Sequence, residues 1–285
     1  MPTSRFGRPV HGNHPVMAQP QLSYDRVGTG EPLLLLHGFG STRADFTALV
    51  TDLAANFDVL SIDLPGHGAS PMILGRPTVA ALTDAIVADL DAHGLDRVHV
   101  LGNSLGGRLA IELARRHRAL SIVSISPCGL GAPLERIHQG ALMITARMLN
   151  RARRPWIDEL SRTPAGRTAL LAGMRSMPWQ ASPAEALTVK GGFADQTGFW
   201  STLWNAIMID VPTGLDKIDC PVIVAQGAMD IIGSGQTPRY TPLIPGARFT
   251  LLPGAGHAPQ SDTPHTIIDL VRRAADRSEA RSPAA

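Results

Sequence analysis

The chain has 285 residues, of which 44% are hydrophobic and 18% are charged, and it contains 28 glycines and 23 prolines. This composition is typical of a globular protein with a large core, and it excludes a disordered chain, a collagen-like chain and a coiled coil. The 26 basic and 24 acidic side chains leave a formal net charge of +2, which is too small to make nucleic acid the expected partner.

Cysteine, histidine and apolar-run patterns exclude further classes of protein. Cys128 and Cys220 are too few for a disulfide framework or a zinc site made of four cysteines, so we expect two free buried thiols. His11 and His14 fall in residues 1–20, which we expect to form a flexible arm rather than a metal site. Neither a signal-peptide pattern nor a membrane-spanning apolar run is found, so we expect a cytoplasmic protein with no integral membrane segment.

Continuous apolar runs bounded by glycine or proline predict buried strands of a parallel sheet, at residues 33–36, 58–64, 97–101, 121–126, 221–227 and 248–252. Helical patterns alternate with these runs, at residues 41–54, 78–93, 108–117 and 263–275. The alternation predicts an α/β fold whose mostly parallel sheet has helices on both faces.

The alternation is interrupted at residues 132–215, where the pattern is helical and no strand is expected. This stretch holds all four tryptophans and five of the nine methionines. We therefore expect a single α/β core domain, formed by residues 21–131 and 216–276, that is interrupted by a helical insertion. Residues 277–285 are expected to form a polar tail.

A G-x-S-x-G motif occupies residues 102–106, between a predicted strand and a predicted helix. This context suits a nucleophile elbow, a tight turn that points the Ser104 hydroxyl away from the edge of the sheet. The N-terminus of the following helix directs amide N–H groups toward a negative charge that develops there. The alternative interpretation is a glycine-rich loop between strand and helix with no chemical role.

A serine hydroxyl is a weak nucleophile and needs a base. His257 follows the last predicted strand, so we expect it at the same edge of the sheet as Ser104. His37 and His67 also follow strands, but both lie in glycine-rich turns, where we expect them to pack within the loops.

The acid of a triad is expected after a strand that lies between the serine and the histidine in the chain. Asp230 follows the strand at residues 221–227, whereas Asp219 precedes that strand and is expected at the opposite end of the sheet. Asp230 would accept a hydrogen bond from the imidazole of His257 and fix its tautomer.

Two backbone N–H groups are candidates for an oxyanion hole. Leu105 directly follows the serine, and Phe39 lies in the glycine-rich loop after the first strong strand. The methionines and tryptophans of the insertion favour an apolar small-molecule substrate. Candidate substrate-pocket residues are Gly38, Asn103 and Trp204.

These blocks together resemble the α/β-hydrolase superfamily over residues 31–275, at LLLLHGFG (33–40), DLPGHG (63–68), GNSLGG (102–107), 221–230 and 254–257. The resemblance implies a mostly parallel, eight-stranded sheet flanked by helices, with a helical cap at residues 132–215. It assigns the nucleophile, acid and base to Ser104, Asp230 and His257. It also implies a serine hydrolase that needs no cofactor or metal and that works through an acyl-enzyme.

Within the superfamily the chain is similar to carboxylesterases and to hydrolases that cleave carbon–carbon bonds in ring-fission products. The latter share Asn103 before the serine, but they commonly have a tryptophan where this chain has Ala258. Serine as nucleophile argues against haloalkane dehalogenases and epoxide hydrolases. We therefore expect cleavage of a carboxylic ester or lactone, with carbon–carbon cleavage of a diketone, or acyl transfer, as alternatives.

Two further alternatives belong to other classes. A dinucleotide-binding domain would need a third glycine where this chain has Arg43, and it would leave the triad residues unexplained. A non-catalytic, small-molecule-binding member of the same fold is the other alternative. The basic run at residues 151–154 is expected to be a solvated helix face, or else to attract an anionic substrate.

Overall fold

The computed structural model describes residues 21–280 except Arg153 and Ser234. The arm predicted at residues 1–20 lies outside the described residues, as do residues 281–285. The described strands form one sheet in the order β1-β3-β2-β4-β5-β6-β7, with bounds β1 (Tyr24–Val27), β2 (Glu31–Leu36), β3 (Phe57–Ile62), β4 (Val98–Asn103), β5 (Ala119–Ile125), β6 (Val222–Gly227) and β7 (Arg248–Leu252).

All pairs of neighbouring strands are parallel except β1 with β3. The predicted α/β fold with a mostly parallel sheet is therefore confirmed, with seven strands in the described part of the chain where eight were expected. Strand β1 was not predicted from the sequence, because all four residues of this strand are exposed and show no apolar alternation. This edge strand is defined by its pairing with β3, in which Tyr24 lies opposite Ile62.

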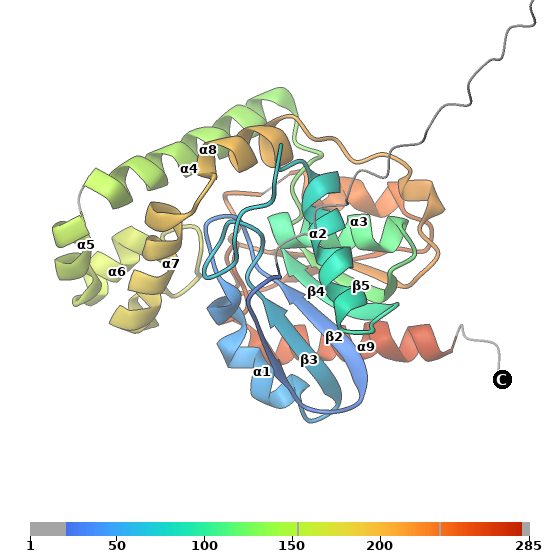
Figure 1. The fold of residues 1–285 in the computed structure, drawn as a ribbon. Coiled ribbons are helices and arrows are strands. Elements are labelled where there is room, and N and C mark those ends of the chain that lie inside the picture. Colours follow the sequence, from blue (N-terminus) through green and yellow to red (C-terminus); the bar gives the residue numbers. More distant parts are fainter. Residues whose placement is uncertain (1–20, 153, 234, 281–285) are drawn as a thin grey trace, which may run out of the picture.

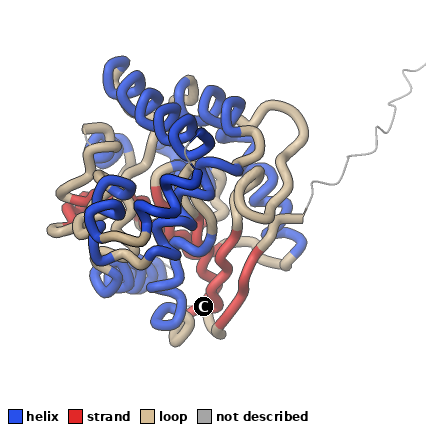
Figure 2. Tube along the Cα trace, turned by 90° about the vertical axis from the view of Figure 1, so that its left-hand side faces the viewer, coloured by secondary structure: helices blue, strands red, loops and turns tan. Residues whose placement is uncertain are grey.

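Helices cover both faces of the sheet (Figures 1 and 2). One face carries α1 (Thr47–Leu53), which follows a 3₁₀ turn (Arg43–Phe46), and α9 (Pro264–Glu279), while the other carries α2 (Val79–Ala92) and α3 (Leu105–Arg115). Alternate residues of β2 divide between two buried clusters: Leu33 and Leu35 join the cluster of α1 and α9, and Leu34 and Leu36 join that of α2 and α3. Because residues 33–36 of β2 are buried on both faces of the sheet, that part of its sequence is an unbroken apolar run.

Helix boundaries agree with the predicted pattern to within a few residues. Thr78 caps α2, since its hydroxyl accepts a hydrogen bond from the Ala81 amide at 3.2 Å. At the other end of the chain, α9 continues to Glu279, beyond the helix end predicted at residue 275. Cys128 and Cys220 are both buried, as predicted.

A helical insertion separates β5 from β6, on the side of the sheet toward which β2 and β3 point (Figure 1). Its described elements are α4 (Pro133–Ala152), α5 (Arg154–Ser161), α6 (Pro164–Leu171), a 3₁₀ turn (Pro178–Gln180), α7 (Pro183–Asp195), α8 (Phe199–Thr202) and a π-helical turn, η3 (Leu203–Met208). Further 3₁₀ turns lie at Leu215–Lys217, before β6, and at Thr237–Leu243, between β6 and β7.

One arginine joins the two chain segments that connect the insertion to the core. The guanidinium of Arg136 donates to the carbonyls of Gly129 at 2.5 Å and Gly131 at 2.9 Å, on the segment that enters the insertion. It also donates to the carbonyls of Met208 at 2.8 Å and Asp210 at 3.3 Å, on the segment that leaves it. These four bonds fix the base of the insertion relative to the sheet.

Candidate active site

Ser104 occupies the turn between β4 and α3, as the G-x-S-x-G motif predicts. Its backbone has φ 55° and ψ −112°, a strained conformation for a residue with a side chain. The turn is tight: a Cβ built on Gly106 would lie 2.0 Å from the carbonyl oxygen of Leu36. Only glycine therefore fits at this position, where α3 begins against β2. Ser104 itself is 4% exposed.

Asp230 and His257 are brought together at the carboxyl ends of β6 and β7. The Nδ1 atom of His257 lies 3.0 Å from each carboxylate oxygen of Asp230. The backbone amides of Ile232 and Gly233 each donate to Asp230 Oδ1 at 2.8 Å. Because the carboxylate accepts from Nδ1, the unprotonated nitrogen of a neutral His257 is Nε2, the atom that a general base uses.

The environment of Asp230 favours its ionised form. Burial by itself would raise the pKa of this carboxyl, but the adjacent His257 and the hydrogen bonds from His257 and Gly233 lower it to about 2. The carboxylate therefore stays charged at neutral pH, where it holds and orients the imidazole.

Asn103 connects the serine turn to the histidine loop. Its buried side-chain amide donates a hydrogen bond to the main-chain carbonyl of His257 at 2.9 Å. The Cβ position of Gly38, in the loop after β2, lies 3.4 Å from Cβ of Ser104 and 3.5 Å from Oδ1 of Asn103. The loops after β2 and β7 thus both contact the serine turn, and a Cβ at position 38 would be in van der Waals contact with Ser104.

The two amides predicted for an oxyanion hole come from the start of α3 and from the loop after β2. Leu105 is the first residue of α3, so its N–H group has no partner within the helix and is directed toward the helix N-terminus. Phe39 lies in the loop that follows β2, directly after Gly38. Its side chain is buried, which fixes the backbone of this loop.

Aromatic contacts join this loop to the insertion. The ring of Phe39 lies 4.9 Å from that of Phe199 and 6.2 Å from that of Phe193, measured between centroids. Arg147 of α4 places its guanidinium carbon 4.9 Å from the centre of the Phe199 ring and donates to the Phe193 carbonyl at 2.6 Å. The predicted oxyanion loop is therefore packed directly under helices of the insertion.

His37 and His67 have the packing role that the sequence predicts. Both are buried, and burial lowers the pKa of His37 to about 4 and that of His67 to about 3. The Leu64 amide donates to Nε2 of His37 at 2.9 Å, so the proton of the neutral ring is on Nδ1, which faces the Gly38 carbonyl at 2.8 Å. Nε2 is thus occupied by a backbone donor and is not available as a base.

In a dinucleotide-binding domain, Asp63 would be the acidic residue that binds the ribose. Here its carboxylate is engaged by groups of the protein itself. Asp63 forms an ion pair with the guanidinium of Arg43 and accepts a hydrogen bond from the Arg43 amide at 2.8 Å. Its second oxygen also accepts from the Ala69 amide at 2.9 Å. Asp63 therefore holds the loops after β2 and β3 together.

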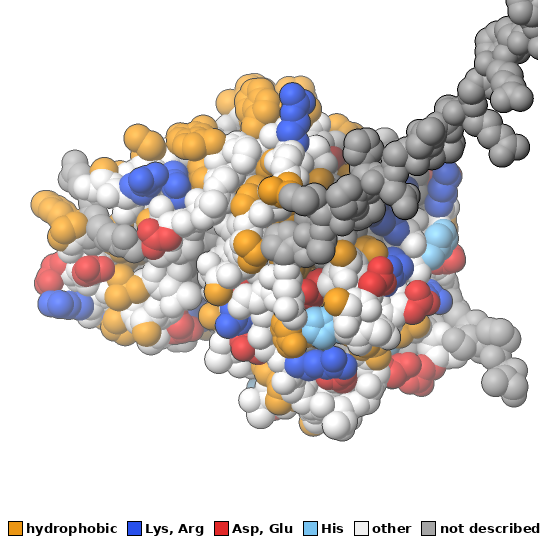
Figure 3. Space-filling model, viewed as in Figure 1, with side chains coloured by type: hydrophobic (Ala, Val, Ile, Leu, Met, Phe, Trp, Pro, Cys, Tyr) orange, Lys and Arg blue, Asp and Glu red, His pale blue; other side chains and the backbone are white. Residues whose placement is uncertain are grey.

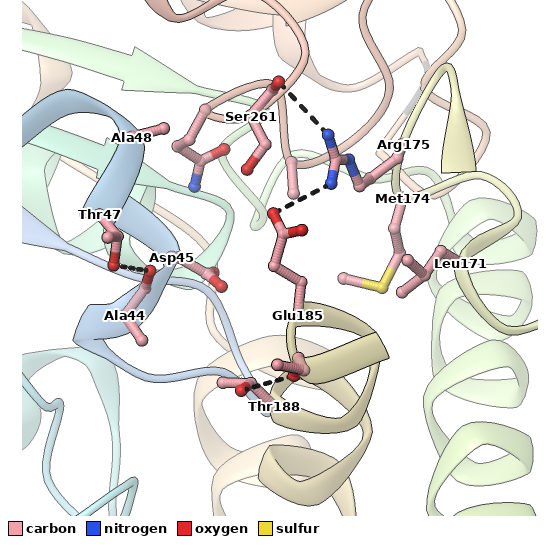
Figure 4. A pocket seen from close by; sticks show the side chains of 13 residues that line it. Ala44, Asp45, Thr47, Ala48, Leu171, Met174, Arg175, Glu185, Thr188 and Ser261 are labelled. Carbon is pink, nitrogen blue, oxygen red and sulfur yellow. Dashed lines mark hydrogen bonds and ion pairs between the residues drawn. The ribbon is translucent and has the colours of Figure 1, made fainter. Parts of the chain in front are cut away.

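A cleft of about 390 Å³ lies beside the histidine loop, between the start of α1 and the insertion (Figure 4). Ala258, the residue after His257, lines it together with Leu171 and Met174 of the insertion. Arg175, which also lines the cleft, donates a hydrogen bond to the Ser261 carbonyl at 3.3 Å. It forms an ion pair with Glu185, also at 3.3 Å. The lining is mainly apolar.

Trp204 was predicted to line the substrate pocket together with Gly38 and Asn103. Among the described residues, the structure shows no contact between Trp204 and either of them. It is 60% exposed and lines a groove on the outside of the insertion. Within the described residues, no group of three or more His, Cys, Asp or Glu side chains is arranged to hold a metal ion. No helix in the described part of the chain is both long and apolar enough to cross a bilayer.

Comparison with known proteins places this geometry among hydrolases. Residues 33–270 match the model of the alpha/beta hydrolase family. The pimeloyl-[acyl-carrier protein] methyl ester esterase of Neisseria meningitidis is 30% identical over 240 residues, which cover 79% of this chain and 85% of that protein. A thermophilic esterase from Thermogutta terrifontis has a similar structure, with a TM-score of 0.71 and 23% identity over 90% of this chain and 93% of the esterase.

A further relative is similar over only part of its length. The dihydrolipoyllysine-residue acetyltransferase component of the acetoin cleaving system of Cupriavidus necator is 36% identical over 114 residues. That match covers 39% of this chain, and it spans about a third of the relative (30%).

Proposed function

Because the chain belongs to the alpha/beta hydrolase family, we propose that it is a serine hydrolase that cleaves an acyl bond by way of an acyl-enzyme. Ser104 is the nucleophile, His257 the general base and Asp230 the residue that orients the base. The observation that carries the proposal is the bidentate contact of Asp230 with Nδ1 of His257 at 3.0 Å. Of this pair, His257 lies in a loop that Asn103 joins to the serine turn.

The proposed reaction has two stages. The Ser104 oxygen attacks the acyl carbonyl while His257 takes its proton, and the amides of Phe39 and Leu105 stabilise the oxyanion. His257 then returns the proton to the leaving alcohol, and the acyl-enzyme remains. Water, deprotonated by His257, attacks the same carbonyl, and collapse of the second oxyanion releases the acid and restores Ser104.

We propose that the substrate is a carboxylic ester or lactone of a fairly apolar small molecule. The helical insertion would act as a cap, because Phe193 and Phe199 pack onto the loop that carries the Phe39 amide. The mainly apolar cleft that Ala258 lines offers about 390 Å³ beside the histidine loop, although Ser104 and His257 are not among the residues that line it. The similarity to an esterase of pimeloyl-[acyl-carrier protein] methyl ester also supports ester cleavage.

Carbon–carbon cleavage of a ring-fission diketone is the second candidate. It is favoured by the buried polar side of α4, where Gln139 and Arg147 are 3% and 7% exposed and Arg147 lies next to Phe199. A buried guanidinium suits the carboxylate that such substrates carry.

The proposal is tested with a fluorophosphonate label and a series of p-nitrophenyl esters of increasing acyl length. The wild-type protein, Ser104→Ala and Ser201→Ala are compared, since Ser201 is an exposed serine of the insertion and serves as a matched control. We expect labelling and ester turnover in the wild type and the control, and loss of both in Ser104→Ala.

Other outcomes lead to different conclusions. Labelling of Ser104 without ester turnover would redirect the assignment to ring-fission dienes or to a narrow class of lactones. A folded wild-type protein with neither labelling nor turnover would contradict the serine hydrolase and favour a binding protein of the same fold. Labelling that persists in Ser104→Ala would contradict the assigned nucleophile.

A further inference from the structure

The longest helix of the insertion, α4, buries several polar side chains and exposes several apolar ones. Side chains that face the protein include Gln139, Arg147 and Asn150, which are 3–7% exposed. The opposite side presents an apolar stripe to the outside, with exposed fractions from 39% to 80%, formed by Leu134, Ile137, Ile144 and Met148. Packing among the described residues does not account for the stripe, because its members face away from the core.

Two tryptophans widen the stripe into a patch. Trp200 of α8 and Trp204 of the π-helical turn are 52% and 60% exposed. Between them and α4 runs a groove of about 470 Å³, which is lined only by apolar residues and glycine, among them Ile137, Ile144, Trp200, Leu203, Trp204 and Met208. Contiguous exposed apolar side chains of this kind mark an interaction site on a protein surface. We call this set of residues, with Leu134 and Met148, the outer patch.

The insertion that carries the outer patch also carries the positive charge of the chain. Residues 132–215 hold nine Lys and Arg against six Asp and Glu, a net charge of +3, whereas the rest of the sequence has seventeen against eighteen. Figure 3 shows hydrophobic side chains gathered along the edge of the molecule where α4 and α8 lie, with Lys or Arg side chains beside them. Arg151, at the end of α4, is one exposed cation.

We propose that the outer patch docks on the surface of an anionic lipid bilayer, with α4 lying in the plane of the membrane. An exposed apolar stripe with tryptophans and neighbouring cations is the pattern of helices that bind at the lipid–water interface. The indole rings enter the headgroup region, where an apolar ring with one N–H group is stable. The net charge of the insertion is attracted to anionic headgroups.

A second copy of the chain fits this surface less well. In a twofold dimer the same patch meets itself, so two insertions of net charge +3 would face each other and repel. Anionic lipid neutralises that charge and buries the same apolar side chains. The balance of charge therefore favours the bilayer as the occupant.

Co-sedimentation with lipid vesicles tests this proposal without any substrate, so its outcome does not depend on the proposed enzymatic activity. The full chain is mixed with vesicles of phosphatidylcholine alone and with an equimolar mixture of phosphatidylcholine and phosphatidylglycerol. The test variant combines Trp200→Ser with Trp204→Ser. The control is Trp179→Ser, because Trp179 is 47% exposed and lies outside the outer patch.

We expect the wild type and Trp179→Ser to sediment with the anionic vesicles, and the partition coefficient of the double variant to fall by about tenfold or more. Added salt should weaken the binding. Absence of binding to either vesicle would overturn the proposal, as would equal binding by the double variant. A wild-type dimer that the same two substitutions dissociate, measured by sedimentation velocity, would also overturn it and assign the patch to self-association.

Leu134→Ser, at an 80% exposed position, provides a second variant should the double variant fail to fold. It is expected to weaken vesicle binding in the same direction.

Discussion

Asn103 and His257 are joined by a hydrogen bond between a side chain and the main chain, in which the Asn103 amide donates to the His257 carbonyl at 2.9 Å. Both residues are almost completely buried, so neither group has water as an alternative partner. The bond fixes the backbone of the histidine relative to the residue before the serine. Asn103 was predicted to line the substrate pocket, and in the structure its donor is committed to positioning the histidine loop.

We expect Asn103→Asp to lower kcat by about tenfold to a hundredfold while KM changes little, because the carboxylate keeps the size of the amide but repels the carbonyl that it faces. Asn205→Asp is the matched control, since the Asn205 amide donates to the Ser201 carbonyl at 2.8 Å on the exposed side of the insertion. Steady-state kinetics on an ester that the wild type hydrolyses would measure both. Wild-type kcat in a stably folded Asn103→Asp protein would contradict a positioning role.

The elements that the sequence predicts best are those whose surroundings are set by local pattern. The run at β2 identified a strand that is buried on both faces, and G-x-S-x-G identified the serine turn. The pairing of Asp230 with His257 followed from topology, because the carboxyl ends of neighbouring parallel strands meet at one edge of the sheet. These inferences need no knowledge of how distant side chains pack.

The features that sequence reasoning missed depend on long-range packing. Asn103 and His257 are 154 residues apart, and nothing in either segment predicts their bond. In α4 the periodicity predicts a helix, but it does not reveal which side faces the core, and Arg147 is buried while Ile137 is exposed. Trp204 was predicted to line the pocket because an insertion rich in tryptophan and methionine favours an apolar substrate, whereas here the ring lies on the outer surface.

Asp230→Asn should lower kcat by about a thousandfold or more, because an amide offers only one acceptor oxygen and can hold His257 in the wrong tautomer. The matched control is Asp219→Asn. Asp219 also contacts a histidine, His117, at 3.1 Å, but this pair is exposed and lies before β6 instead of after it. We expect the control to keep its activity. A mild effect of Asp230→Asn would point to a different acid.

The activity of the wild type should fall on the acid side because a histidine that acts as a general base cannot accept a proton once it is protonated. Asp230 does not cause this fall, since its pKa of about 2 keeps the carboxylate ionised. The measurement is kcat/KM across about pH 5 to 8. A rate that is constant over this range would count against a histidine base.

Stability should also depend on pH through the two buried histidines of the loops. The pKa of His37 is lowered to about 4 and that of His67 to about 3, chiefly by burial, whereas a histidine in the unfolded chain titrates near about 6.5. Between about pH 6.5 and 4 the unfolded chain therefore binds protons that the folded chain does not. The free energy of unfolding should fall by up to about 1.4 kcal/mol per pH unit for each histidine as the pH decreases.

His67→Asn removes one of these two titrations. Urea unfolding at several pH values between about 5 and 7 should show a slope that is smaller than that of the wild type by about one proton. The comparison of slopes cancels the contribution of the carboxyl groups, which the two proteins share. Equal slopes would mean that His67 binds its proton equally in the folded and unfolded states.

A pair of glycine substitutions tests the close approach at the serine turn. In Gly106→Ala the new methyl group would lie 2.0 Å from the Leu36 carbonyl oxygen and 2.6 Å from that of His37, and both neighbours are backbone atoms that cannot move aside. We expect a loss of about 3 kcal/mol or more in the free energy of unfolding. Gly191→Ala is the control, because no atom beyond its chain neighbours and the backbone of its own helix lies within 4 Å of its Cβ position in α7; there alanine should stabilise the helix by about 0.5–1 kcal/mol. Chemical denaturation of both variants would measure the difference, and a Gly106→Ala protein as stable as the wild type would show that α3 does not rest against β2 at this distance.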